Sequence, residues 1–140
     1  MRVMAFKFER LEVWQLALSY VDVIYDLSAK LPRNEEYNLK SQIRRAATSI
    51  SLNIAEGSIG LTDAEQRRFI SIAIRSLVET IACLHLIHRR KYIEDPKILR
   101  QAYSDGEILF KRLKAFQNAL DTTTLHEDSP IYESNEPPPF

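Results

Sequence analysis

The chain has 140 residues, of which 45% are hydrophobic and 27% are charged, with 19 basic and 19 acidic residues. This length predicts one domain with a substantial core and is too short for a multidomain enzyme. A single cysteine excludes an internal disulfide framework and any metal site built from cysteines alone, as suits a reducing cytosol. The sequence lacks an uncharged apolar run of about 18 residues and an apolar secretory segment near its start. We therefore expect a cytoplasmic protein without a membrane partner.

The zero net charge hides an uneven distribution along the chain. Residues 1–120 hold all 19 basic residues and 14 acidic ones, which gives them a net charge of +5. Residues 121–140 hold the other five acidic residues and four of the six prolines. A segment this poor in apolar residues cannot offset the entropy lost on ordering. We therefore expect a bundle domain at residues 1–120 and a disordered, acidic, proline-rich tail at residues 121–140.

Long segments without glycine or proline carry apolar residues at the spacing of three and four that is typical of helices. The first predicted helix has an apolar stripe from Trp14 to Leu31, and the proline that follows ends it. The second is predicted to begin near Asn34, a good N-cap, and to stop at Gly57 and Gly60.

Two further helices follow from capping signals. Thr62 and Glu65 form a capping box at the start of the third helix. Asp95 and Pro96 suit the N-cap and first position of the fourth, whose apolar stripe extends to Leu120. Four helices with short connections predict an all-α fold, an antiparallel up-down-up-down four-helix bundle.

The third predicted helix is apolar on more than one side. Besides a core-facing set that includes Phe69, Ile72 and Leu77, a second row points elsewhere, and the first helix carries a similar surplus. The third-helix row is Ile70, Ile74, Val78 and Ile81, and the first-helix residues are Leu16, Leu18, Tyr20 and Tyr25. Large exposed apolar patches usually mark interaction surfaces, so this excess favours self-association. The alternative is a wide stripe that faces a thick intramolecular core.

No constellation of residues predicts catalysis, a metal or a cofactor. His85 and His88 lack the glutamates of the di-iron Glu-x-x-His signature. Cys83 has no histidine at a helical spacing that would make it a nucleophile, so it is expected to be a small core residue. We therefore expect a protein that is not an enzyme.

Polar residues interrupt the apolar faces of the second and third helices. Buried carboxylates persist only when they are paired. We therefore expect a buried polar network in which Arg45 or Arg75 pairs across helices with Glu56 or Glu79; the polar positions are Ser49, Asn53, Glu56, Ser76 and Glu79.

Basic residues form short runs and rows on predicted helix faces. Such rows can track the phosphates of a nucleic acid. The alternative is that they are solvated faces and, near helix C-termini, partners of the helix dipole. The candidate nucleic-acid-binding residues are Lys40, Arg44, Arg67, Arg68, Arg75, Arg89, Arg90 and Lys91.

Several segments resemble the four helix bundle protein family, whose members are encoded by intervening sequences in bacterial 23S ribosomal RNA genes. The similar segments include residues 8–17 (FERLEVWQLA), 24–27 (IYDL), 42–50 (QIRRAATSI), 53–57 (NIAEG), 69–73 (FISIA) and 76–79 (SLVE). The resemblance covers residues 6 to about 120, and one departure is Arg75, where the family often has glycine. It implies an up-down bundle that assembles as a ring-shaped homopentamer and supplies no catalytic residue.

The resemblance also implies a nucleic-acid partner, because accessory proteins of diversity-generating retroelements look like basic pentameric rings of the same bundle. The leading hypothesis is therefore a homopentamer that binds RNA or DNA without cofactors. The alternative is a protein-interaction scaffold that uses its apolar surface and proline-rich tail.

Overall fold

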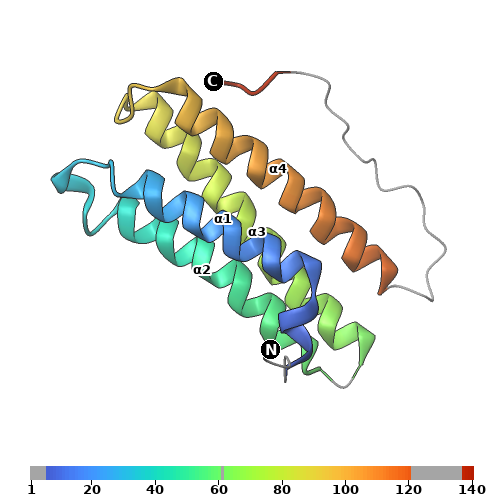
Figure 1. The fold of residues 1–140 in the computed structure, drawn as a ribbon. Coiled ribbons are helices and arrows are strands. Elements are labelled where there is room, and N and C mark those ends of the chain that lie inside the picture. The colour runs from blue at the N-terminus through green and yellow to red at the C-terminus, as the bar shows by residue number, and fades with distance from the viewer. Residues whose placement is uncertain (1–5, 61, 121–136) are drawn as a thin grey trace, which may run out of the picture.

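The computed structural model describes residues 6–60, 62–120 and 137–140, and within them it contains four α-helices and no strand (Figure 1). The predicted all-α, four-helix fold is confirmed. The helices are α1 (Glu12–Ser28), α2 (Leu39–Ser58), α3 (Asp63–Arg89) and α4 (Pro96–Ala119), with 3₁₀ helices η1 (Lys7–Arg10) before α1 and η2 (Arg33–Glu35) before α2.

Helix α1 has one buried face and ends earlier than its apolar stripe suggests. Ala17, Ile24 and Leu27 are buried at helical spacing. The helix stops at Ser28 rather than Leu31, because the chain tightens into i to i+3 hydrogen bonds, such as Leu31 N–H to the Ser28 carbonyl at 3.1 Å, ahead of the proline.

The predicted start of the second helix is wrong, and of the two glycines predicted to stop it only Gly60 lies beyond its end. Asn34 lies within η2, and α2 begins at Leu39, because the residues after Pro32 form tight turns, such as Glu35 N–H to the Pro32 carbonyl at 2.9 Å. Gly57 does not stop α2 either, since it lies inside the helix and is buried.

Gly57 is needed for the close approach of α2 to α3. A Cβ atom at this position would lie 2.8 Å from the Phe69 Cβ and 3.3 Å from the Gln66 backbone carbonyl oxygen, both on α3. Neither atom is at the end of a flexible side chain, so a larger residue would have to push the helices apart. The glycine therefore sets the spacing of the two helices.

The predicted starts of the third and fourth helices are confirmed. The Thr62 hydroxyl accepts a hydrogen bond from the Glu65 backbone N–H at 3.1 Å. The Asp95 carboxylate accepts one from the Lys97 backbone N–H at 3.0 Å, and Pro96 occupies the first turn of α4. These side chains satisfy backbone donors that a helix start leaves free.

The helices lie side by side, and the connections between successive helices alternate between the two ends of the molecule (Figure 1). In the residue pairs between neighbouring helices, the residue number increases along one helix as it decreases along the other. The pairs are Tyr25–Thr48 and Ser28–Arg44 between α1 and α2, Ser49–Ser76 and Gly57–Phe69 between α2 and α3, and Ser71–Gln117 and His85–Tyr103 between α3 and α4. The α1–α2 and α3–α4 connections therefore share one end (Figure 1).

Most of the predicted outward-facing apolar rows belong to the intramolecular core. Ile70 is fully buried, and Ile74 and Ile81 pack against the core. Tyr20 is 2% exposed, and its hydroxyl bonds the Thr80 hydroxyl at 2.7 Å. Of the third-helix row only Val78 is exposed. The expected excess is thus mostly wrong, because α3 packs against both α2 and α4 rather than one neighbour, and its Thr80 also bonds Tyr20 of α1.

The predicted buried ion pairs between α2 and α3 are also wrong. Arg45, Glu56, Arg75 and Glu79 are all exposed, so their charges stay in water. A neutral network lies between the helices instead, formed by the hydroxyl pair of Ser49 and Ser76 at 2.9 Å and by Asn53 Nδ2, which donates to the Ser49 carbonyl at 2.8 Å.

Most of the predicted tail, residues 121–136, lies outside the described residues, so its disorder stays a prediction. Residues 137–140 are described, and Phe140 is 8% exposed against α3 and α4.

Helix α3 is long and apolar enough to cross a membrane by length and composition alone. Arg75 and Glu79 lie near its middle, and Ile70, Leu77 and Leu84 are buried against the other helices. A core helix of a bundle passes the same test, so this feature carries little weight.

We expect Gly57→Ala to lower the free energy of unfolding by about 1–3 kcal/mol, because its methyl group meets Phe69 and backbone. Urea unfolding measures the change. Gly106→Ala is the comparison, since its Cβ would meet side chains and no backbone, with Ile81 Cδ1 at 2.6 Å and the Tyr20 hydroxyl at 3.1 Å. If both variants lose the same stability, the close approach at Gly57 is not the cause.

Candidate nucleic-acid interface

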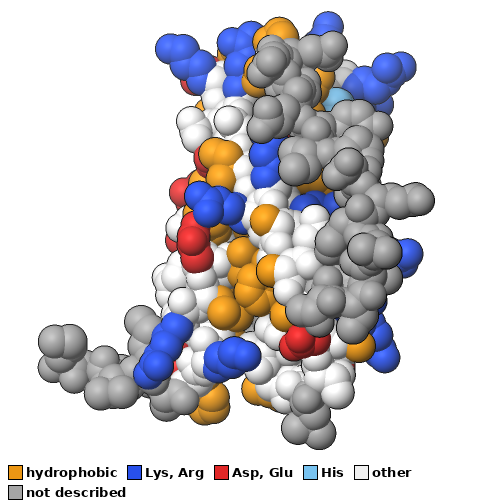
Figure 2. Space-filling view, turned by 90° about the vertical axis from the view of Figure 1, so that its right-hand side faces the viewer, with side chains coloured by type: hydrophobic (Ala, Val, Ile, Leu, Met, Phe, Trp, Pro, Cys, Tyr) orange, Lys and Arg blue, Asp and Glu red, His pale blue; other side chains and the backbone are white. Residues whose placement is uncertain are grey.

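The shared end of the molecule holds most of the net positive charge of the bundle. It consists of residues 26–44, around the α1–α2 connection, and residues 89–100, around the α3–α4 connection; we call this region the basic end. It holds nine basic and five acidic residues, a net charge of +4, whereas all of residues 1–120 carry +5. Figure 2 shows Lys and Arg side chains clustered at the upper end of the molecule. The rest of the bundle is close to neutral.

Arg44 is the most firmly held cation of the basic end. Its Nε donates to the Ser28 hydroxyl at 2.6 Å, and its guanidinium lies 4.7 Å from the centre of the Tyr25 ring. The Ser28 hydroxyl in turn donates to the Tyr25 backbone carbonyl at 2.9 Å. A guanidinium that is stacked and bonded in this way loses less conformational entropy when it binds an anion.

Lys40, in the first turn of α2, is already engaged by a residue of the turn that precedes the helix. Its ammonium lies 2.8 Å from the Glu36 carboxylate. The hydrogen bond from Lys40 is the main reason that the pKa of Glu36 lies below its ordinary value. An exposed pair of this kind contributes little to stability, so Lys40 can exchange Glu36 for a phosphate.

The run Arg89, Arg90 and Lys91 ends α3 and faces solvent. A hydrogen bond with Tyr92, followed by the charges of Tyr92 and of Glu35 in the other connection, raises the pKa of Arg90. The influence of Glu35 agrees with the two connections lying at one end. Lys91 has a φ of 57°, in the left-handed region that favours glycine, and it closes the helix as Tyr92 N–H bonds the Ile87 carbonyl at 3.2 Å.

The eight candidate residues do not form one site. Lys40, Arg44 and the run of residues 89–91 belong to the basic end. Arg67 and Arg68 lie in the second turn of α3, near the opposite end of the molecule, and exposed Arg75 lies between the two ends. The basic end also contains four basic residues that the sequence analysis did not select as candidates: Lys30, Arg33, Lys97 and Arg100. The predicted topology was sufficient to find them, because it places the α1–α2 and α3–α4 connections, which carry these residues, at the same end of the bundle.

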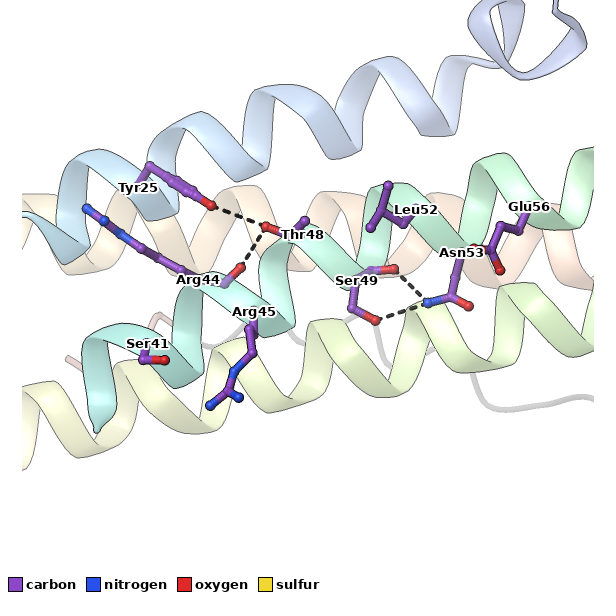
Figure 3. A pocket seen from close by; sticks show the side chains of 9 residues that line it. All are labelled: Tyr25, Ser41, Arg44, Arg45, Thr48, Ser49, Leu52, Asn53 and Glu56. Atoms are coloured by element: carbon purple, nitrogen blue, oxygen red, sulfur yellow. Dashed lines mark hydrogen bonds between the residues drawn. The ribbon is translucent and has the colours of Figure 1, made fainter. Parts of the chain in front are cut away.

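A shallow groove of about 690 Å³ runs along the outer side of α2 from the basic end (Figure 3). Arg44 and Arg45 lie toward one end of it and Glu56 lies at the other (Figure 3). The lining residues are Tyr25, Ser41, Arg44, Arg45, Thr48, Ser49, Leu52, Asn53 and Glu56. Its hydroxyl and amide groups can bond a sugar or phosphate, while Leu52, which is 55% exposed, offers an apolar contact.

The described residues contain no group of three His, Cys, Asp or Glu side chains placed to hold a metal ion. Cys83 is buried, and burial, with the charge of Glu79, raises the pKa of its thiol to about 11. A thiol that is protonated at neutral pH is a poor nucleophile. The chemistry available at the basic end is therefore ionic and hydrogen-bonding.

Fold and surface together define a four-helix, all-α protein with a charged end. The chain belongs to the 23S rRNA-intervening sequence protein family, which it matches over residues 9–115. It is also similar to a crystal structure of a protein of unknown function from the S23 ribosomal protein family of Bacteroides thetaiotaomicron, with 26% identity and a TM-score of 0.69 over 75% of this chain and 97% of that one. No curated protein matches the chain. Neither description names an enzymatic activity.

We expect Lys91→Gly to remove one charge from the basic end and still raise the free energy of unfolding by about 0.5–1 kcal/mol, because glycine adopts the left-handed conformation without a Cβ clash. Urea unfolding measures this change. Lys91→Ala removes the same charge and keeps the strain, so it should not be stabilised. A Lys91→Gly variant less stable than wild type would contradict the proposed role of this position in ending α3.

Proposed function

We propose that this protein is a non-enzymatic, cytoplasmic, homo-oligomeric bundle that binds the phosphate backbone of RNA or DNA through its basic end. The observation that carries the proposal is the charge distribution, because +4 of the +5 net charge of residues 1–120 lies at this end. We take the repeating unit to be an antiparallel up-down-up-down bundle, supported by the residue pairs between its helices.

Backbone binding fits the side chains present. Lysine and arginine attract phosphates regardless of base sequence, and such contacts release counterions. Arg44 is pre-positioned on Tyr25 and Ser28, whereas Arg89, Arg90 and Lys91 are exposed and free to adapt. This combination supports salt-sensitive binding with little sequence preference.

Self-association rests on apolar side chains that remain exposed on the bundle. Leu52 of α2, Val78 and Leu86 of α3 and Ile108 of α4 are each 50–55% exposed. We propose that such residues contribute to a pentamer, in which five basic ends would act together on one ligand. This repetition would strengthen a weak single-copy interaction.

Replacing Arg89, Arg90 and Lys91 together with glutamine is expected to weaken binding of a short RNA hairpin at low salt by more than tenfold. Each lost phosphate contact removes close to one unit from the slope of log affinity against log salt, so the slope should fall by about 2–3. Filter binding over a series of salt concentrations measures both quantities, and a DNA duplex of equal length compares the two nucleic acids.

The matched control replaces Lys111, Arg112 and Lys114 with glutamine. It removes the same charge from the C-terminal half of α4, away from the basic end. This control should bind nearly as well as wild type. Equal losses of RNA affinity in the two triple variants would show that binding depends on net charge alone. If wild type does not bind the hairpin at low salt, the proposed function is rejected.

Light scattering on the purified chain is expected to give a mass about five times the 16.2 kDa of one chain at micromolar concentration. Leu52→Lys with Val78→Lys should lower this mass, because each places a charge where an apolar contact is proposed. A wild-type mass of one chain would reject the oligomer and leave the single-copy basic end as the binding unit.

A further inference from the structure

The described C-terminal residues place an aromatic ring in a site built by α3 and α4. The Phe140 ring lies 5.1 Å from the His85 ring, 5.0 Å from the His88 ring and 5.5 Å from the Tyr103 ring, measured between centroids. The rings of His85 and Tyr103 meet it edge-on, and that of His88 lies tilted at 30°. This is the offset and edge-to-face geometry that aromatic groups prefer.

The backbone at Phe140 is recognised as well as its ring. Arg100, in the second turn of α4, donates from its Nε to the Phe140 carbonyl oxygen at 2.7 Å. Phe140 is 8% exposed although it lies far in sequence from the four described helices, and it forms part of the same buried cluster as the helix residues. Ring and carbonyl together fix both the position and the direction of the segment.

We propose that His85, His88, Arg100 and Tyr103 form a recognition site for a proline-rich peptide segment that presents a phenylalanine, and that this chain's own residues 137–140 occupy it. Three consecutive prolines precede Phe140 and hold the segment extended at a low entropy cost. Aromatic-lined surfaces bind such segments because the ligand is already in its bound shape.

The occupant is the same copy of the chain. The chain from Leu120 to Pro137 spans 17 residue links and can reach up to about 58 Å. The axial distance along α4 from Leu120 back to Arg100 is about 30 Å. The link is therefore long enough for its own site, and tethering raises the effective concentration of the segment there.

The peptide site adjoins the basic end. His88 precedes Arg89 directly, and Arg100 belongs to the basic end while it bonds Phe140. Phe140 and a phosphate group would therefore compete for Arg100. This consequence rests on the proposed function, whereas the peptide site itself does not.

A fluorescently labelled peptide with the sequence of residues 131–140 tests the site directly. It should bind the full-length Phe140→Ala variant saturably, because that variant leaves the site open. Binding to wild type should be about tenfold weaker, since the tethered segment competes. A peptide with alanine in place of its phenylalanine should bind about tenfold more weakly or worse.

Two further variants, each combined with Phe140→Ala, separate the site from general charge. Arg100→Gln should weaken peptide binding, whereas Lys97→Gln, which removes the same charge from the same part of α4, should not. Circular dichroism verifies that each variant stays helical. Absence of saturable binding to folded Phe140→Ala, or equal binding to wild type, would overturn the site. The tethered segment of wild type should compete with the labelled peptide at every protein concentration. If it competes only at concentrations where chains associate, the segment that fills the site belongs to another copy of the chain, and the assignment to the same copy is overturned.

RNA binding by the Phe140→Ala variant separates the two proposals. Low-salt affinity for the RNA hairpin should rise when Phe140 no longer engages Arg100. If neither protein binds RNA while the peptide still binds, the proposed function fails and the peptide site stands. If RNA binds equally to both while the peptide binds as expected, competition at Arg100 is refuted.

Discussion

The close contact between α2 and α3 at Gly57 is the constraint on which the rest of the bundle depends. With no side chain at this position, α2 approaches α3 until a Cβ would meet Phe69 and the Gln66 carbonyl. Further along the pair, the Ser49 and Ser76 hydroxyls bond directly, which small residues permit. The register of these two contacts fixes which ends of the helices coincide, so it also decides where the charges of the connections fall.

That register turns a weakly charged chain into a molecule with a distinct basic end. A net charge of +5 spread over 120 residues attracts an anion only feebly, whereas +4 confined to two adjoining connections creates a local positive field. The same end carries two different kinds of cation. Arg44 is held in place by Tyr25 and Ser28, and the run at the end of α3 is exposed to solvent. Contacts from lysine and arginine to phosphates fix the position of a protein on a nucleic acid.

The proposed peptide site adjoins the basic end and recognises its segment without a phosphate group. Its three rings provide shape, and Arg100 provides direction through one carbonyl oxygen. His85 and His88, which lack the glutamates of a di-iron motif, thus both contact an aromatic ring. The two proposals correspond to the two interpretations of the sequence, a nucleic-acid binder and a protein-interaction scaffold, and both involve Arg100.

The sequence by itself determined that there are four helices and where α3 and α4 begin, since helical periodicity and the hydrogen bonds of Thr62 and Asp95 are local. It also indicated the topology, from which the meeting of the two connections follows. It did not reveal that Ile70 and Tyr20 are buried or that Arg45 and Glu79 are exposed, because a helix packed against several neighbours buries more than one stripe. Nor did it show that Gly57 continues a helix or that Phe140 returns to α3 and α4. Such outcomes depend on contacts between residues distant in sequence, which only the tertiary structure decided.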